Sequence, residues 1–287
     1  MTNSIELRQT NPQNKANPHR IRVNCISPFP GSYNPNNQGY YLKEGSAEAS
    51  IHELLFNMRK DDHNYWVGAV VPEGATAFTK VQVFFHPKPT NGGALDKDYP
   101  KLTSQGWRAK YDHMWFLGVQ LANVRKTPLI YPFMRESAFS RQKNAPSPTF
   151  MFATRPRETL SAIVSAVRTA VTGKAGAVDV GQIGVSGFSS GVDGMKLFAA
   201  TFGSSIVETT DFDGPLRKGE PRTVWTTPGA VGRVITQVPP KVPNTPGYLY
   251  LPAWQFKFIG KTAFAENVHK QIGYLTFLTA MAQSRIV

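Results

Sequence analysis

Cysteine is almost absent from this chain of 287 residues, and that scarcity excludes two kinds of structure. Cys25 is the only one, so no disulfide within the chain can form and no cysteine-based metal site exists. The sequence also lacks a His-x-x-x-His spacing, a phosphate-binding glycine loop and a dinucleotide fingerprint. We therefore expect chemistry that uses neither a metal nor a cofactor.

Long apolar runs are missing as well. No segment approaches the roughly 20 apolar residues of a transmembrane helix. The first 20 residues also lack the apolar core of a signal peptide. We therefore expect a soluble, cytoplasmic protein. With 41% hydrophobic and 18% charged residues, the composition is that of a globular chain with a sizeable core.

Acidic residues are scarce beside basic ones, 19 against 32, which leaves a net charge of +13. The excess is spread along the chain, with no Lys/Arg run, zinc-finger spacing or aromatic–basic segment, so no nucleic-acid motif is present. A generally basic surface follows, and it could contact an anionic partner. Residues 214–287 carry nine basic and two acidic side chains, which favours anionic substrates or lipid surfaces.

The order of patterns along the chain predicts the fold class. Residues 1–65 are expected to form a loop-rich N-terminal arm, because Asn, Pro and Gly crowd residues 1–40. Residues 66–287 form the expected catalytic domain, with an irregular cap region at 215–247. In that domain, strand patterns (79–87, 127–134, 177–189, 204–214, 248–259) alternate with helix patterns (107–122, 156–176, 191–203, 266–283). This alternation predicts an α/β fold, with a mainly parallel central sheet covered by helices on both faces.

One short motif lies where a buried strand is expected to end and a helix to begin. Gly187-Phe188-Ser189-Ser190-Gly191 satisfies G-x-S-x-G. In that context the central serine occupies a sharp, strained turn that lifts its hydroxyl above the sheet, while the glycines let neighbouring backbone pass close by. Ser186 also follows a glycine two positions earlier, but it lacks the second glycine and belongs to the strand. Ser189 is therefore the candidate nucleophile.

With the G-x-S-x-G motif between a strand and a helix, residues 66–287 resemble the α/β-hydrolase superfamily of serine esterases and lipases. The resemblance implies a serine hydrolase that cleaves a carboxylic ester, of a small molecule or a lipid, through an acyl-enzyme. It also implies that nucleophile, acid and histidine follow in that chain order. The amide of Ser190 would be one oxyanion donor. The second would come from Lys88 or His86, since Pro87 has no N–H, and a structural role is favoured for His86.

The resemblance directs the search for the base and the acid to the residues after Ser189. His269 is the only histidine there, and it begins the last expected helix, where the catalytic histidine of the family usually lies. The usual acid position is empty, because no Asp or Glu occurs between Pro221 and Ala265. Asp211 and Asp213 end the strand that follows the motif helix, a position that some lipases of this family use. Asp213 is preferred because it is nearer the strand end and precedes Gly-Pro. The other carboxylates after the serine are Asp193, Glu208, Glu220 and Glu266.

Two alternatives remain open at this point. An acyltransferase would use the same three side chains and differ only in the group that accepts the acyl unit. A non-catalytic binding protein could have the same fold, with its basic surface contacting nucleic acid or another anionic partner. A separation between Ser189 and His269 too large for a hydrogen bond would identify the binding protein.

Overall fold

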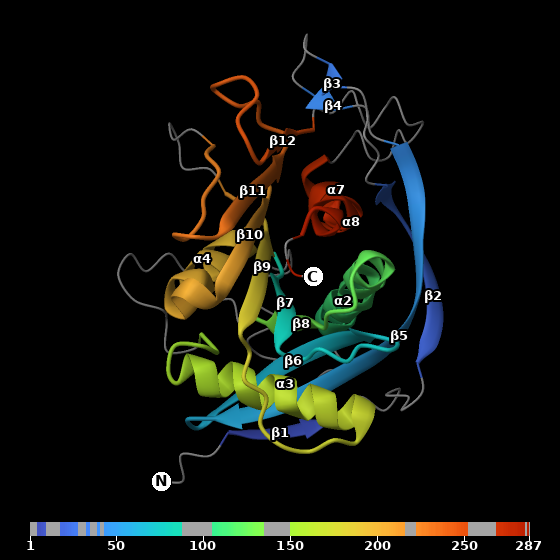
Figure 1. The fold of residues 1–287 in the computed structure, drawn as a ribbon, viewed down its shortest axis with the longest axis vertical. Helices are drawn as coiled ribbons and strands as arrows, with labels where there is room; N and C mark the ends of the chain where they lie inside the picture. Colours follow the sequence, from blue (N-terminus) through green and yellow to red (C-terminus); the bar gives the residue numbers. More distant parts are fainter. Residues whose placement is uncertain are drawn as a thin grey trace.

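A mixed β-sheet with helices on both faces forms the centre of the molecule (Figure 1). The computed structural model describes residues 5–9, 18–27, 33–34, 39–40, 43–87, 105–134, 150–215, 222–251, 268–284 and 286. The strands are β1 (Glu6–Gln9), β2 (His19–Ser27), β3 (Tyr33–Asn34), β4 (Gly39–Tyr40), β5 (Lys43–Lys60), β6 (His63–Pro72), β7 (Lys80–Phe85), β8 (Leu129–Phe133), β9 (Gln182–Phe188), β10 (Ile206–Phe212), β11 (Val231–Thr236) and β12 (Tyr248–Tyr250). The helices are α2 (Gln105–Val124), α3 (Pro156–Thr172), α4 (Gly191–Phe202), the 3₁₀ turn η2 (Gly203–Ser205), α7 (Val268–Leu275) and α8 (Phe277–Ala282).

The middle of the sheet is parallel, as the sequence predicts. Strands lie in the order β1-β5-β6-β8-β7-β9-β10-β11-β12-β4-β3, with β2 paired to β5. Every pair from β8 through to β12 is parallel. Strands β7, β9 and β10 are buried along almost their whole length, because crossover helices cover both faces of a parallel sheet. The α/β fold class is therefore confirmed.

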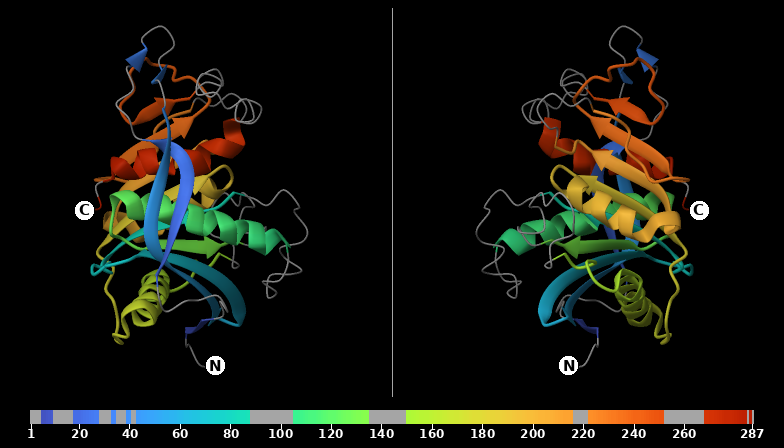
Figure 2. Two further views of the ribbon diagram at one scale, coloured as in Figure 1. Left: turned by 90° about the vertical axis from the view of Figure 1, so that its right-hand side faces the viewer. Right: turned by 90° about the vertical axis from the view of Figure 1, so that its left-hand side faces the viewer.

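Helices α3 and α4 cover one face of the sheet, while α2, α7 and α8 cover the other (Figures 1 and 2). Leu160, Ile163, Val164, Val167 and Val171 recur at helical spacing in α3; the first four are at most 1% exposed, and Val171 is partly buried. Period-3.6 spacing places these side chains on one side of the helix, so burying them docks α3 on the sheet. The two layers make separate cores, and β9 and β10 run between them.

The described part of residues 1–65 is strand rather than the loop-rich arm we expected. Strand β5 pairs with β1, β2 and β6, so the proposed boundary at residue 65 falls within a continuous antiparallel ribbon. The β2–β5 ribbon passes outside α2 and α8 (Figure 2), where the Thr279 hydroxyl donates to the carbonyl of Ile26. The sequence does carry a strand pattern in β2, because polar Arg22 and Asn24, which are exposed, alternate with Val23 and Cys25, which are buried. The many turn-forming residues on either side of this short pattern led to the prediction of a loop.

The C-terminal region differs from expectation in its continuity. The single helix predicted over 266–283 is two helices, because Thr276 separates α7 from α8. The Thr276 hydroxyl bonds back to the Ile272 carbonyl four residues earlier, a contact that often bends helices. The expected buried stripe (Val268, Ile272, Leu275, Thr279) is at most 9% exposed. Of the strand predicted over 248–259, β12 occupies 248–250 and most of the rest lies outside the described residues. Among the described helices, none is long and apolar enough to cross a bilayer.

Candidate active site

Ser189 occupies the turn between β9 and α4, and its backbone is strained. Its φ is 52°, in the left-handed region that costs a non-glycine residue about 1–3 kcal/mol. Two hydrogen bonds hold it there. The Ser189 amide donates to the carbonyl of Phe212 on β10 at 3.0 Å, and the Ser189 carbonyl accepts the amide of Val192 at 3.0 Å. The neighbouring strand and the first turn of α4 thus impose the conformation that the motif predicted.

Both glycines of the motif are required by close backbone approach. A Cβ at Gly187 would lie 2.7 Å from the carbonyl oxygen of Gly191. A Cβ at Gly191 would lie 2.2 Å from the carbonyl oxygen of Phe85 and 2.5 Å from that of His86. Real Cβ atoms do not approach backbone oxygens so closely, so the turn is packed directly against the end of β7.

We expect Gly191→Ala to destabilise the protein by about 2–3 kcal/mol, because either the turn or the end of β7 must move. Gly181→Ala is the matched control, since a Cβ there would meet nothing nearer than the Thr79 carbonyl at 4.0 Å. Thermal unfolding of both variants measures the difference. Equal stability of the two variants would contradict the close packing of the turn.

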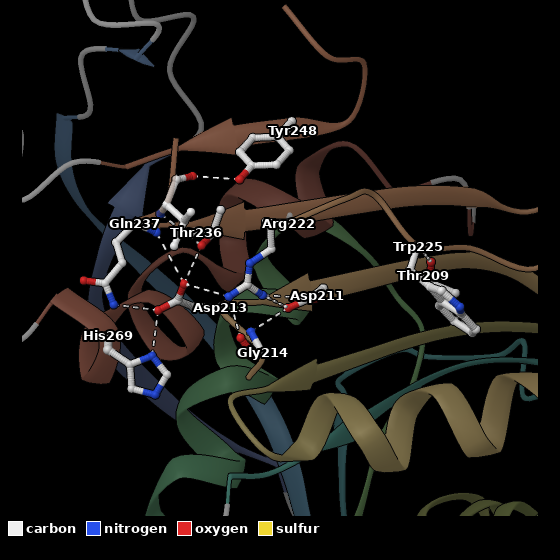
Figure 3. Close-up of polar contacts among 11 residues, drawn as sticks. Thr209, Asp211, Asp213, Gly214, Arg222, Trp225, Thr236, Gln237, Tyr248 and His269 are labelled. Atoms are coloured by element: carbon white, nitrogen blue, oxygen red, sulfur yellow. Dashed lines mark hydrogen bonds and ion pairs between the residues drawn. The ribbon is translucent and has the colours of Figure 1, made fainter. Parts of the chain in front are cut away.

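His269, in the first turn of α7, joins Ser189 to Asp213. Its Nε2 lies 3.0 Å from the Ser189 hydroxyl oxygen. Its Nδ1 lies 2.6 Å from Asp213 Oδ2 (Figure 3). A carboxylate can only accept, so Nδ1 carries a proton and Nε2 is free to accept one from the serine. The Phe188 ring lies beside the imidazole, with 5.1 Å between ring centroids. Three segments far apart in the chain therefore meet in one continuous hydrogen-bonded line.

Asp213 is held as a carboxylate by donors from β11. It is 3% exposed, and it accepts hydrogen bonds from the Thr236 hydroxyl and, at 2.8 Å, from the side-chain amide of Gln237 (Figure 3). Burial alone would raise the pKa of Asp213, but the bonds from His269, Thr236 and Gln237 outweigh it and lower that pKa below its ordinary value. At neutral pH, the group facing the imidazole is therefore negatively charged.

Asp211 makes no contact of this kind with the imidazole. Its Oδ1 accepts the Gly214 amide at 2.7 Å, and Arg222 Nη1 lies 3.4 Å from both of its oxygens. Burial raises the pKa of Asp211, and the Arg222 guanidinium and the Gly214 amide oppose that rise only in part. Of the two carboxylates that the sequence left as alternatives, Asp213 is the one that reaches His269.

The remaining carboxylates lie elsewhere or outside the described residues. Glu208, 1% exposed, accepts bonds from Gln82 and Ser284, each at 2.6 Å, and pairs with Arg233 at 3.0 Å. Asp193 is in the first turn of α4. Glu220 and Glu266 fall outside the described residues.

The oxyanion donors expected from the sequence are only partly described. Ser190 follows the nucleophile and is the N-cap of α4, so the positive end of that helix dipole lies beside Ser189. Lys88 lies outside the described residues. His86 is fully buried. Its Nε2 accepts the Met134 amide at 2.7 Å and its Nδ1 lies 2.7 Å from the Pro87 carbonyl, so both ring nitrogens are engaged in holding backbone.

Three polar residues around Asp213 were missed by sequence reasoning. Thr236 ends β11 and Gln237 directly follows it. Arg222 lies in the Pro/Gly-rich segment before β11, 5% exposed and 3.6 Å from Asp213 Oδ1 (Figure 3). A lone Arg, Thr or Gln in an irregular stretch has no motif that marks it. The register of β10 against β11 places Thr236 and Gln237 beside Asp213, and the segment before β11 brings Arg222 there. Within the described residues, no group of three or more His, Cys, Asp or Glu is arranged to hold a metal ion.

Sequence comparison finds no protein-family model that matches this chain, and no characterised protein. The structure is similar to an esterase from Pseudomonas putida, with 15% identity over 57% of this chain and 44% of that one and a TM-score of 0.32. It is also similar to an S-formylglutathione hydrolase from Agrobacterium tumefaciens, with 10% identity over 57% of this chain and 58% of that one and a TM-score of 0.35. A third similarity is to a proline iminopeptidase from Mycobacterium smegmatis, with 19% identity over 55% of this chain and 43% of that one and a TM-score of 0.29. The matched region spans about half the length of each of these proteins.

The arrangement of the elements is that of an α/β-hydrolase-like fold. A parallel strand ends in a strained G-x-S-x-G turn that opens a helix, and Ser189, Asp213 and His269 follow in that chain order. Ser189 and His269 are 3.0 Å apart, which is within hydrogen-bond reach. A separation too large for a hydrogen bond was the feature expected of a non-catalytic binding protein.

Proposed function

We propose that this protein is a serine hydrolase that cleaves carboxylic esters through an acyl-enzyme. One observation carries the proposal. His269 bridges the Ser189 hydroxyl, at 3.0 Å, and the Asp213 carboxylate, at 2.6 Å. A serine hydroxyl is a weak nucleophile at neutral pH, so a base in hydrogen-bond reach, oriented by a buried anion, is the requirement for its activation.

In the proposed reaction, His269 Nε2 takes the proton of Ser189 as the hydroxyl oxygen attacks the ester carbonyl carbon. The amide of Ser190 stabilises the negative charge that develops on the carbonyl oxygen. His269 then returns the proton to the departing alcohol, which leaves Ser189 acylated. A water molecule, activated by the same imidazole, releases the acid and restores the serine. Asp213 keeps the proton on Nδ1 and stabilises the imidazolium.

The charge of the chain suggests a class of ester. Residues 214–287 carry nine basic and two acidic side chains, and they contain Asp213's neighbours as well as His269. An ester with an anionic group, or one presented at an anionic lipid surface, fits this balance. Comparing hydrolysis of anionic and neutral esters of equal acyl length at low and high salt tests this point. A preference for the neutral ester would contradict it.

A fluorophosphonate probe tests the proposed function, because it phosphonylates a serine that a neighbouring base has activated, with loss of fluoride. We expect stoichiometric labelling of the native protein on the peptide that contains Ser189, identified by mass spectrometry. Heat-denatured protein is the control and should not react. Labelling at another residue, or no labelling of folded protein, would exclude the mechanism. Added alcohols that capture the acyl group in place of water would instead indicate an acyltransferase.

Activity should fall as the pH drops, because only a neutral imidazole can accept the serine proton. Asp213 keeps its charge through that range, since its pKa is lowered. A single acid limb is therefore expected in kcat/KM, and it belongs to His269. Rates measured from pH 4 to pH 9 would reveal it, and a profile without an acid limb would exclude His269 as the base.

A further inference from the structure

Two buried charged groups near the site have no role in the reaction described so far. Asp211 is 6% exposed and Arg222 is 5% exposed, and they lie 3.4 Å apart. The other end of the Arg222 guanidinium lies 3.6 Å from Asp213 and donates to the Gly214 carbonyl (Figure 3). A buried cation beside a carboxylate is a large electrostatic perturbation, so its effect on Asp213 and His269 must be considered.

A charge count over the described residues shows what the pair does. With both carboxylates ionised, Asp211, Asp213 and Arg222 sum to one negative charge, which becomes zero when His269 is protonated. Without Asp211, the Arg222 cation would be unbalanced, and protonated His269 would bring the cluster to one positive charge. Asp211 thus balances the positive charge of Arg222. Without Asp211, that charge would weaken the stabilisation of the His269 imidazolium by Asp213.

The other titratable groups facing this cluster are two tyrosines and one lysine, and they stay the same whether Asp211 is present or not. Tyr248 on β12 senses all three charges, but burial raises its pKa to about 12, and its hydroxyl donates to the Val238 carbonyl at 2.7 Å. Its neighbour Tyr250 is likewise a phenol and ordinarily neutral at pH 7. Lys196 on α4 acts on Asp211 from a distance and lies over the Trp225 ring, 5.7 Å from its centroid.

We infer that Asp211 and Arg222 form a buried neutralising pair that sets how tightly His269 holds a proton. They are positioning residues, since neither touches the serine. The inference rests on the proposed function, because that proton is the one His269 would take from Ser189. It explains why a second buried carboxylate stands two residues from Asp213 without reaching the imidazole.

The decisive variant is Asp211→Asn, which removes the charge but keeps an oxygen that can accept the Gly214 amide. Arg222 then faces Asp213 unbalanced. We expect the protonation midpoint of His269 to fall by about one pH unit. The double variant Asp211→Asn/Arg222→Gln removes both charges, so the midpoint should return most of the way to its native value. A merely structural role of Asp211 would make the double variant worse than the single one.

The midpoint is measured by NMR titration of the imidazole ring, with the His269 signal assigned by its loss in His269→Gln. This readout does not require turnover. Asp179→Asn is the matched control, because it removes one exposed carboxylate before β9, at the end of that strand opposite to Ser189, and should leave the midpoint unchanged. An unchanged midpoint in Asp211→Asn, or the same midpoint in the single and double variants, would overturn the inference.

Two further measurements keep the test decisive. If Asp211→Asn does not fold, Arg222→Gln replaces it. Removing the cation cannot weaken the hold on the proton, so a fall in the midpoint would overturn the inference. The fluorophosphonate reaction separates this inference from the proposed function. Midpoint shifts without labelling of Ser189 would exclude the hydrolase and leave the pair, whereas labelling without midpoint shifts would do the reverse.

Discussion

Replacing Ser189 by Ala is expected to lower ester hydrolysis by about 10⁶-fold in kcat, the loss seen when a serine nucleophile is removed from a hydrolase. The fold should survive, because the hydroxyl is only partly buried and its hydrogen bond is to His269. The strained turn also remains, since its backbone bonds to Phe212 and Val192 do not involve the side chain. Single-turnover kinetics with an activated ester would measure the loss.

Ser186→Ala is the matched control for this variant. Ser186 is on β9, 1% exposed, and its hydroxyl oxygen has no hydrogen-bond partner among the residues that the structure describes. Removing a buried hydroxyl that makes no bond should leave stability unchanged or slightly raised. Activity should stay near the native value. If Ser186→Ala were inactive and Ser189→Ala active, the assignment of the nucleophile would be wrong.

Asp213→Asn is expected to lower turnover by about 10⁴-fold, by analogy with the equivalent change in serine proteases. The amide nitrogen of Asn cannot accept from His269 Nδ1, so the imidazole would adopt the tautomer that has no lone pair toward Ser189. The negative charge that stabilises the imidazolium is lost as well. Steady-state kinetics, with circular dichroism to check the fold, would separate lost chemistry from lost structure.

Asp211→Asn is the comparison for that prediction. We expect a loss of about tenfold or less at neutral pH, because Asp211 acts on the base only through charge. Equal and small losses in the two variants would mean that Ser189 and His269 act as a dyad. A large loss in Asp211→Asn alone would transfer the role of the acid to Asp211.

The amino-acid sequence determined the local part of this site. The motif around Ser189 lies between a continuous apolar strand and an amphipathic helix, and those patterns are local, with periods of a few residues. Local spacing also accounts for the buried face of α3, where Leu160, Ile163, Val164 and Val167 are at most 1% exposed. His269 could be selected from the sequence because the chain has a single histidine after Ser189.

Tertiary structure decided which groups surround that base. Asp211 is on β10 and Asp213 directly follows the end of that strand, so no sequence pattern separates them. The turn after Phe212, where Asp213 adopts a φ of 49°, sends one carboxylate to His269 and the other to Arg222. Thr236 and Gln237 reach the site because β11 pairs with β10 in its observed register, and Arg222 reaches it from the segment that precedes β11. Strands β2 and β5 form for a similar reason, since β-sheet pairing is satisfied by partners distant in the chain, which a local pattern does not report.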